Sequence, residues 1–174
     1  MSRRVSKLFA IILTIAMVFT LSGCGKKLKT VTYNSEKTNT SISLSYDEKS
    51  SFTYSENMED LRTSSENAIL KGENFNIAIQ IESYYSYKNI DELKKSRKSY
   101  QDFKEVKYND LNGFSYYYAP YVRYEVILPL NDKYYVKLHI YSINSKDKNE
   151  DVKKLYNSDE VQEILNTVKI STEK

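Results

Sequence analysis

Residues 133–143 read KYYVKLHIYSI, and this stretch decides the fold because its apolar side chains recur at every second position. A period of two indicates a β-strand, since successive side chains of a strand point to opposite faces of a sheet. One face carries Tyr134, Val136, Leu138 and Ile140, and the other carries Tyr135, Lys137, His139 and Tyr141. An apolar face opposite a more polar face is typical of an antiparallel sheet with one face in the core.

Two further segments alternate in the same way and extend this sheet. The apolar sets are Phe75, Ile77, Ile79 and Ile81 in NFNIAIQIES (74–83), and Val122, Tyr124, Val126 and Leu128 in VRYEVIL (122–128). Turn signals stand at Gly72-Glu73, Asn112-Gly113 and Asn131-Asp132. Asn112-Gly113, between EVKYNDL and FSYYYAP, is a strong hairpin signal because both residues tolerate a positive φ. These turns predict hairpins and therefore antiparallel pairing.

Two segments have the spacing of helices. Residues 89–103, NIDELKKSRKSYQDF, open with a capping-box-like pair, Asn89 and Glu92. Residues 158–168, SDEVQEILNTV, place apolar side chains at i, i+3, i+4 and i+7. The acidic run from Asp147 to Asp151 lies before the second helix and lacks the spacing of a calcium loop, so it is predicted to be a polar loop.

The predicted fold class is α+β, with a single antiparallel β-sheet of about 6–7 strands packed with two main α-helices. One domain is expected over residues 42–174, which is long enough for a core of its own. Three features carry a resemblance: the FTYSEN strand exit (52–57), the helix before a strand–Asn-Gly–strand hairpin, and the closing VQEILNTVKI (161–170). In this pattern the chain resembles the PsbP-type α+β sandwich, a family that includes accessory subunits of membrane complexes.

The N-terminus has the order of a secretory signal peptide. Arg3, Arg4 and Lys7 precede an apolar run, LFAIILTIAMVFTL (8–21), that is too short to span a bilayer as a helix. Leu21, Ser22, Gly23 and Cys24 follow, and this tetrad resembles the lipobox of bacterial lipoproteins. The alternative is an ordinary signal peptide followed by a chance cysteine.

The lipobox resemblance implies that residues 1–23 are removed and that a diacylglycerol is attached to Cys24. The protein is then expected on the extracytoplasmic side of the cell membrane, held by its lipid anchor, with residues 24–41 as a flexible tether. The leader holds three of the 26 basic residues and none of the 23 acids, so the remaining chain is neutral. A neutral chain gives no compositional support for nucleic-acid binding.

The residues required for catalysis or metal binding are scarce. His139 is the sole histidine and Cys24 the sole cysteine, and the four glycines form no phosphate-binding loop. We therefore expect no metal, no cofactor and no enzymatic activity.

Tyrosine is the unusual component, with 17 residues and no tryptophan. A candidate binding face is expected to comprise Tyr117, Arg123, Tyr135, His139 and Tyr141, all predicted to point outward from the sheet. Aromatic and arginine side chains on a rigid sheet are typical of binding surfaces. If a helix covers this face instead, the same tyrosines belong to a second core.

The sequence favours a non-enzymatic binding or accessory module for an envelope or membrane partner. The alternative is a small-ligand-binding lipoprotein associated with a transporter. An exposed tyrosine patch would favour the first function, and a pocket with converging polar groups would favour the second.

Overall fold

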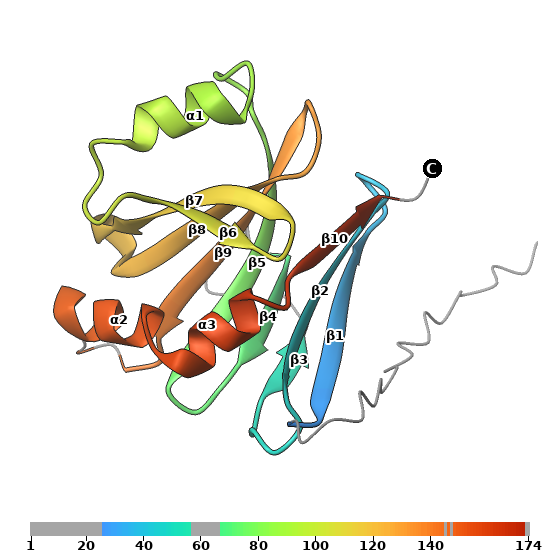
Figure 1. Ribbon diagram of the computed structural model, residues 1–174, viewed down its shortest axis with the longest axis vertical. Coiled ribbons are helices and arrows are strands. Elements are labelled where there is room, and N and C mark those ends of the chain that lie inside the picture. Colours follow the sequence, from blue (N-terminus) through green and yellow to red (C-terminus); the bar gives the residue numbers. More distant parts are fainter. Residues whose placement is uncertain (1–25, 57–66, 145, 147, 173–174) are drawn as a thin grey trace, which may run out of the picture.

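The computed structural model describes residues 26–56, 67–144, 146 and 148–172 (Figure 1). One sheet contains β3 (Thr53–Ser55), β4 (Ala68–Lys71), β5 (Phe75–Ser83), β6 (Lys104–Tyr108), β7 (Leu111–Tyr118), β8 (Arg123–Pro129) and β9 (Tyr134–Ser142). A second sheet contains β1 (Leu28–Ser35), β2 (Thr40–Asp47) and β10 (Lys169–Thr172). The helices are α1 (Ile90–Arg97), α2 (Asn149–Tyr156) and α3 (Asp159–Leu165), and a 3₁₀ turn, η2 (Ala119–Tyr121), joins β7 to β8.

The predicted α+β class is confirmed, and the strand pairings among the described residues are antiparallel. The prediction of a single sheet is wrong. Seven strands form a large sheet in the order β3-β4-β5-β9-β8-β7-β6, and three form a small sheet in the order β1-β2-β10. The division follows from β2, whose Ile42, Leu44 and Tyr46 are buried in the core while its two edges pair with β1 and β10.

The expected tether over residues 24–41 is also corrected, because β1 lies within it. Leu28–Ser35 pairs with β2 along its whole length, and the hydroxyl oxygens of Thr32 and Ser43 lie 2.9 Å apart across the pair. Polar side chains fill most of β1, so the strand has no apolar alternation to reveal it. Residues 1–23 and Cys24 lie outside the described residues.

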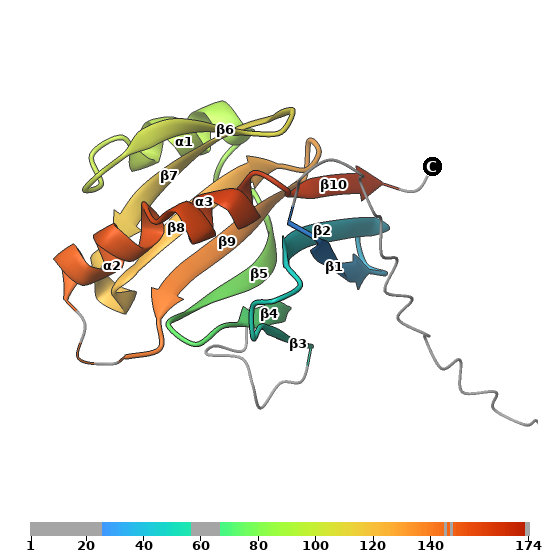
Figure 2. The ribbon, with the colours of Figure 1, turned by 60° about the horizontal axis from the view of Figure 1, so that its bottom comes forward.

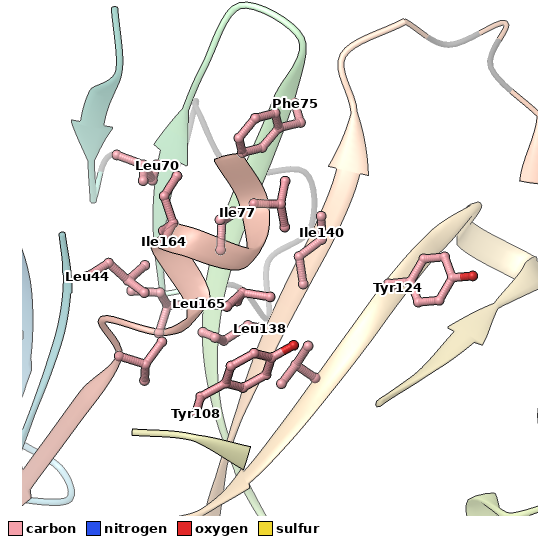
Figure 3. Close-up of a cluster of buried hydrophobic side chains, with 14 of the residues drawn as sticks. Leu44, Leu70, Phe75, Ile77, Tyr108, Tyr124, Leu138, Ile140, Ile164 and Leu165 are labelled. Carbon is pink, nitrogen blue, oxygen red and sulfur yellow. The ribbon is translucent and has the colours of Figure 1, made fainter. Parts of the chain in front are cut away.

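The large sheet is covered on both faces. Figures 1 and 2 show α1 on one side of it, with α2 and α3 on the other. The main core lies on the α2–α3 side and includes Val152 and Tyr156 of α2. Ile164 and Leu165 of α3 belong to the same core, and Figure 3 shows them beside Leu44 of the small sheet. The other side has a separate cluster in which Leu93 of α1 packs on the sheet.

Strand β9, the stretch that set the prediction, lies between β5 and β8. Its apolar face is in the main core, as predicted: Val136, Leu138 and Ile140 are fully buried. Its other face was expected to be polar and outward, yet His139 and Tyr141 are buried as well. The central strand therefore has both faces inside the protein.

Both predicted helices form, and Asn89 caps the first one as predicted. The sequence allows Ser158 or Asn157 to cap the second helix, and the structure has Ser158 there. The Asn89 carboxamide oxygen accepts hydrogen bonds from the backbone N–H groups of Asp91 and Glu92, each at 3.1 Å, and the Ser158 hydroxyl accepts one from Val161. Helix α1 ends at Arg97, earlier than the predicted residue 103.

The sequence prediction missed α2, because its first turn falls in the segment predicted to be a polar loop. Its apolar residues are Val152, Leu155 and Tyr156, a spacing of three and four that covers a single turn. Asp151 supports the N-terminus, since its carboxylate accepts a hydrogen bond from the Lys148 backbone N–H at 3.1 Å.

The predicted turns at Gly72-Glu73 and Asn131-Asp132 are confirmed, whereas the Asn112-Gly113 turn is wrong. The hairpin turns at Asn109 and Asp110, with φ of 53° at Asn109, and Gly113 lies inside β7. A Cβ atom at Gly113 would lie 2.2 Å from the carbonyl oxygen of Ile127. Glycine is needed there for close approach of two strands and not for a turn.

We predict that Gly113→Ala lowers the free energy of unfolding by about 1–3 kcal/mol, because the methyl group must push β7 away from β8. Chemical denaturation measures the change. Asn112→Ala, at the exposed neighbouring position, is the control and should change the free energy by less than about 0.5 kcal/mol. Equal effects of the two substitutions would contradict the close-approach explanation.

Candidate functional site

The five residues of the predicted binding face do not share one face. Arg123, Tyr135, His139 and Tyr141 lie on the α1 side of the large sheet, but Tyr117 lies on the main-core side. The cause is register: Tyr117 is paired directly with Tyr124, and directly paired residues lie on the same face. Its ring packs against that of Tyr124 at a centroid distance of 5.6 Å.

None of the five is exposed, so the expected exposed tyrosine patch is wrong. Their exposed fractions are 6% for Tyr117, 5% for Arg123, 5% for Tyr135, 0% for His139 and 4% for Tyr141. Helix α1 covers part of the face: its Leu93 belongs to the same buried cluster as Tyr116 and Tyr135. The sequence analysis offered the alternative that a helix covers the face and that its tyrosines form a second core. This alternative is correct for the part of the face beneath α1.

Next to that cluster the face is hollowed by a cavity of about 400 Å³, which we call the arginine pocket. Its charged and amide residues are Gln80, Glu82, Arg97, Arg123, Glu125 and Lys137. Its aromatic residues are Tyr100, Tyr116, Tyr118 and Tyr121. They come from β5, β7, β8, β9, α1, the segment after α1, and the turn η2. The three cations and two carboxylates leave one net positive charge.

Glu125 is the central carboxylate of the pocket and is 2% exposed. One of its oxygens, Oε1, accepts hydrogen bonds from Arg123 Nε at 3.0 Å and Nη2 at 2.6 Å. The other, Oε2, accepts a hydrogen bond from the Tyr116 hydroxyl at 2.5 Å and lies 3.8 Å from Lys137 Nζ. The His139 Nε2 atom is 4.0 Å from Oε1.

These neighbours keep Glu125 ionised. Burial by itself would raise its pKa, but the positive charges of Lys137 and Arg123 and the Tyr116 hydrogen bond together hold the pKa below its ordinary value of 4.5. Burial and the nearby Glu125 charge raise the pKa of the Tyr116 hydroxyl, so it remains protonated and a donor.

A second carboxylate, Glu82, connects the pocket to the rest of the face. Its oxygens accept hydrogen bonds from the Tyr135 hydroxyl and from Gln80 Nε2, the latter at 2.5 Å. Lys137 Nζ lies 3.0 Å from Glu82 and so bridges the two carboxylates. The negative charges are therefore compensated inside the protein.

The two arginines have unused hydrogen-bonding capacity. Arg123 Nη1 and Arg97 Nε are buried, and among the described residues neither has a hydrogen-bond partner. Tyrosine rings hold both guanidinium groups by cation–π contact. Arg97 lies 5.2 Å from the Tyr100 ring centroid, and Arg123 lies 4.8 Å from that of Tyr121. A buried donor without a partner costs free energy, which a bound acceptor would recover.

Most of this site was not predicted from the sequence, although Arg123 was. A signal was present in RYEVILP, where Arg123 and Glu125 stand two residues apart on one face of an otherwise apolar strand. A charge in such a strand requires a partner. Arg97 gave no signal, because it follows two lysines on a polar helix.

The described residues contain neither a candidate metal site nor a candidate membrane-spanning helix. Among them there is no cluster of three or more His, Cys, Asp or Glu side chains that could hold a metal ion. No helix they form has the length and apolar character needed to cross a membrane.

Comparison with known proteins gives no match: no family model, no curated protein and no solved structure matches the chain. The resemblances to bacterial lipoproteins and to the PsbP-type sandwich therefore stay predictions.

We predict that Glu125→Gln lowers the free energy of unfolding by about 3–5 kcal/mol at pH 7, because it leaves Arg123 and Lys137 buried beside a neutral amide. Glu105→Gln is the control, since Glu105 is an exposed carboxylate whose ion pair is with Lys94. Its effect should stay below about 1 kcal/mol.

The same variant tests how the contribution of Glu125 to stability depends on pH. The pKa of Glu125 is lowered by folding, so its stabilisation is complete above pH 4.5 and is lost as the pH falls below that value. Denaturation measured at several pH values should show a shallower acid loss of stability in Glu125→Gln than in the unsubstituted chain. Parallel curves would contradict an ionised Glu125.

Proposed function

We propose that this protein is a lipid-anchored, extracytoplasmic binding protein that takes a small organic anion into the arginine pocket. The observation that carries the proposal is that two arginine side chains of the pocket, Arg97 and Arg123, each have a buried N–H that has no partner among the described residues. Of the two functions expected from the sequence, this one corresponds to the small-ligand-binding lipoprotein. Docking through an exposed tyrosine face has less support, because those residues are buried.

The chemistry of the pocket favours a carboxylate or phosphate. Arginine presents donors in a planar fork that matches either group. Glu125 occupies one edge of the Arg123 fork, through Nε and Nη2, and leaves Nη1 for a ligand. The excess positive charge of the lining attracts an anion further.

The aromatic residues suggest what the rest of the ligand is like. The rings of Tyr100 and Tyr118 are nearly parallel, with an interplanar angle of 10° and a centroid distance of 6.1 Å. The Tyr118 ring also stacks on the Tyr121 ring, at a centroid distance of 5.6 Å. Together they form an aromatic wall between the two arginines. A flat organic group could lie against such a wall. A cavity of about 400 Å³ suits a small molecule and not a polymer.

The membrane location rests on the sequence. The lipobox-like tetrad ending at Cys24 supports attachment by a diacylglycerol, and two acyl chains are sufficient for stable anchoring. A PsbP-type sandwich, a family with accessory subunits of membrane complexes, agrees with a role at the membrane. Strand β1 begins at Leu28, four residues after Cys24, so the domain would lie close to the bilayer.

We predict that Arg97→Gln weakens binding of benzoate and phenyl phosphate by roughly ten-fold or more, since a hydrogen bond to a charged group is worth about 1.5–3 kcal/mol. Saturation-transfer NMR on the full chain in phosphatidylcholine nanodiscs measures the affinity. Arg97 interacts with the Tyr116 hydroxyl but takes no part in the ion pair of Arg123 with Glu125, so the substitution leaves that ion pair in place.

Lys95→Gln is the matched control, because it removes one positive charge from the exposed side of the same helix. It should leave the affinity unchanged. Benzyl alcohol, which has the same ring but no charge, should bind far more weakly than benzoate. Equal binding of benzoate and benzyl alcohol, or equal losses in the two variants, would contradict an arginine-held anion.

The anchor is tested separately. Cys24→Ala should abolish labelling with radioactive palmitate and leave the precursor uncleaved, because the thiol that accepts the lipid is missing. Gel mobility and the radiolabel report both effects. Normal cleavage and labelling of the variant would rule out the proposed anchor without bearing on the arginine pocket.

A further inference from the structure

A second cavity, of about 660 Å³, lies between α3 and the small sheet, and we call it the α3 cavity. It shares no lining residue with the arginine pocket. Its walls come from the start of β1, the end of β2, the segment before β3, and α3 with the residues after it. Figure 2 shows α3 continuing into β10, which pairs with β2, so the two walls belong to one connected unit.

The cavity is held open by fixed contacts. The Thr167 hydroxyl accepts a hydrogen bond from the Ser45 backbone N–H at 2.7 Å and lies 3.1 Å from the Ser45 carbonyl oxygen. It also lies 2.7 Å from the carbonyl oxygen of Ile164. One side chain thus joins the end of α3 to the edge of the cavity on β2. A preformed cavity binds its ligand at a lower cost of ordering.

The inner surface is apolar and aromatic. Tyr46 and Phe52 line it, and their rings are in edge-to-face contact with a centroid distance of 5.1 Å and an interplanar angle of 61°. Ile164 adds an aliphatic surface, and Leu28, a large apolar side chain that is 37% exposed, also lines the cavity. An apolar ligand body would bury this surface at roughly 25 cal/mol per Å².

The charge of the lining is negative. It holds the carboxylates of Asp47, Asp159, Glu160 and Glu163 and a single basic residue, Lys26. Lys26 is paired with Glu163 at 2.6 Å. Lys26 also interacts electrostatically with Asp47 and Asp159. Four carboxylates and one cation still leave the lining with three net negative charges, which is the opposite charge balance to that of the arginine pocket.

Acidic residues in the first turn of a helix are favourable without any ligand, because they interact with the helix dipole. Tyr46 gives a separate indication of a ligand. Tyr46 is 2% exposed and lines the cavity, and its hydroxyl is buried without a hydrogen-bond partner among the described residues. A buried hydroxyl is normally satisfied. A donor from a ligand, placed within reach of Tyr46, would satisfy it.

We infer that the α3 cavity is a binding site for a small amphiphilic amine, with its apolar body against Phe52 and Ile164 and its ammonium group between Tyr46 and the carboxylates of the lining. The ammonium group can donate to the Tyr46 hydroxyl oxygen. The aromatic rings add cation–π attraction. This site does not depend on the proposed function of the arginine pocket.

The test compares two probes with the same body: 2-phenylethylammonium and the uncharged 2-phenylethanol. Saturation-transfer NMR on the full chain in phosphatidylcholine nanodiscs, with empty nanodiscs as the blank, gives the affinity of each. The cation should bind at least five-fold more tightly, and its advantage should shrink as salt is raised. Equal affinities, or a tighter neutral probe, would overturn the inference.

Two variants locate the binding. Asp159→Asn with Glu160→Gln removes two exposed charges from the cavity and should weaken the cation five-fold or more while leaving the alcohol unaffected. The control, Glu150→Gln with Asp132→Asn, removes the same charge from positions that do not line the cavity and should change neither affinity. If both double variants weaken the cation equally, the attraction is that of the whole protein and the site does not exist.

Tyr46→Phe keeps the buried ring and removes only the unpartnered hydroxyl. Cation affinity should fall several-fold, with circular dichroism confirming an unchanged fold. An unchanged cation affinity in this variant would overturn the inference, because the unpartnered hydroxyl is the observation that distinguishes this cavity from a cluster of surface carboxylates.

Discussion

The structure depends on one buried carboxylate. Glu125 lies in the middle of the large sheet, where an ion is stable only with partners, and its partners include Arg123, Lys137 and Tyr116. These side chains occupy the α1 face of the sheet and prevent it from being apolar throughout. Helix α1 therefore packs where the face is aromatic and leaves the charged part as a pocket. The same interaction orients Arg123 and leaves its Nη1 free of protein partners among the described residues.

A chain of neutral total charge can still contain strongly charged sites. Residues 24–174 have equal numbers of acids and bases, which removed the compositional support for nucleic-acid binding. The structure gathers cations in the arginine pocket and carboxylates around the α3 cavity. Net charge therefore argues against an extended basic surface, but it says nothing about a pocket lined by a few residues.

The sequence correctly predicted those elements whose position is decided by local features of the chain. The alternation in β5, β8 and β9 predicted their inner faces, and the side chain of Asn89 and the apolar spacing over residues 158–168 predicted where two helices begin. It failed where tertiary packing decides. The polar strand β1 forms because β2 offers an edge, and α2 forms because Val152 and Tyr156 meet the sheet. Likewise, Gly113 was taken for a turn because its role, close approach to Ile127, is invisible without the partner strand. The exposure of the tyrosine face depended on the path of α1, and Arg97 enters the site only through that helix.

A crystal structure of the protein grown with benzoate tests the central claim most directly. The account predicts a carboxylate within hydrogen-bond distance of Arg123 Nη1 and Arg97 Nε, with its ring against the tyrosine wall and Glu125 still bound to Arg123. An empty arginine pocket at saturating benzoate, or benzoate bound elsewhere with both arginines turned to solvent, would contradict it.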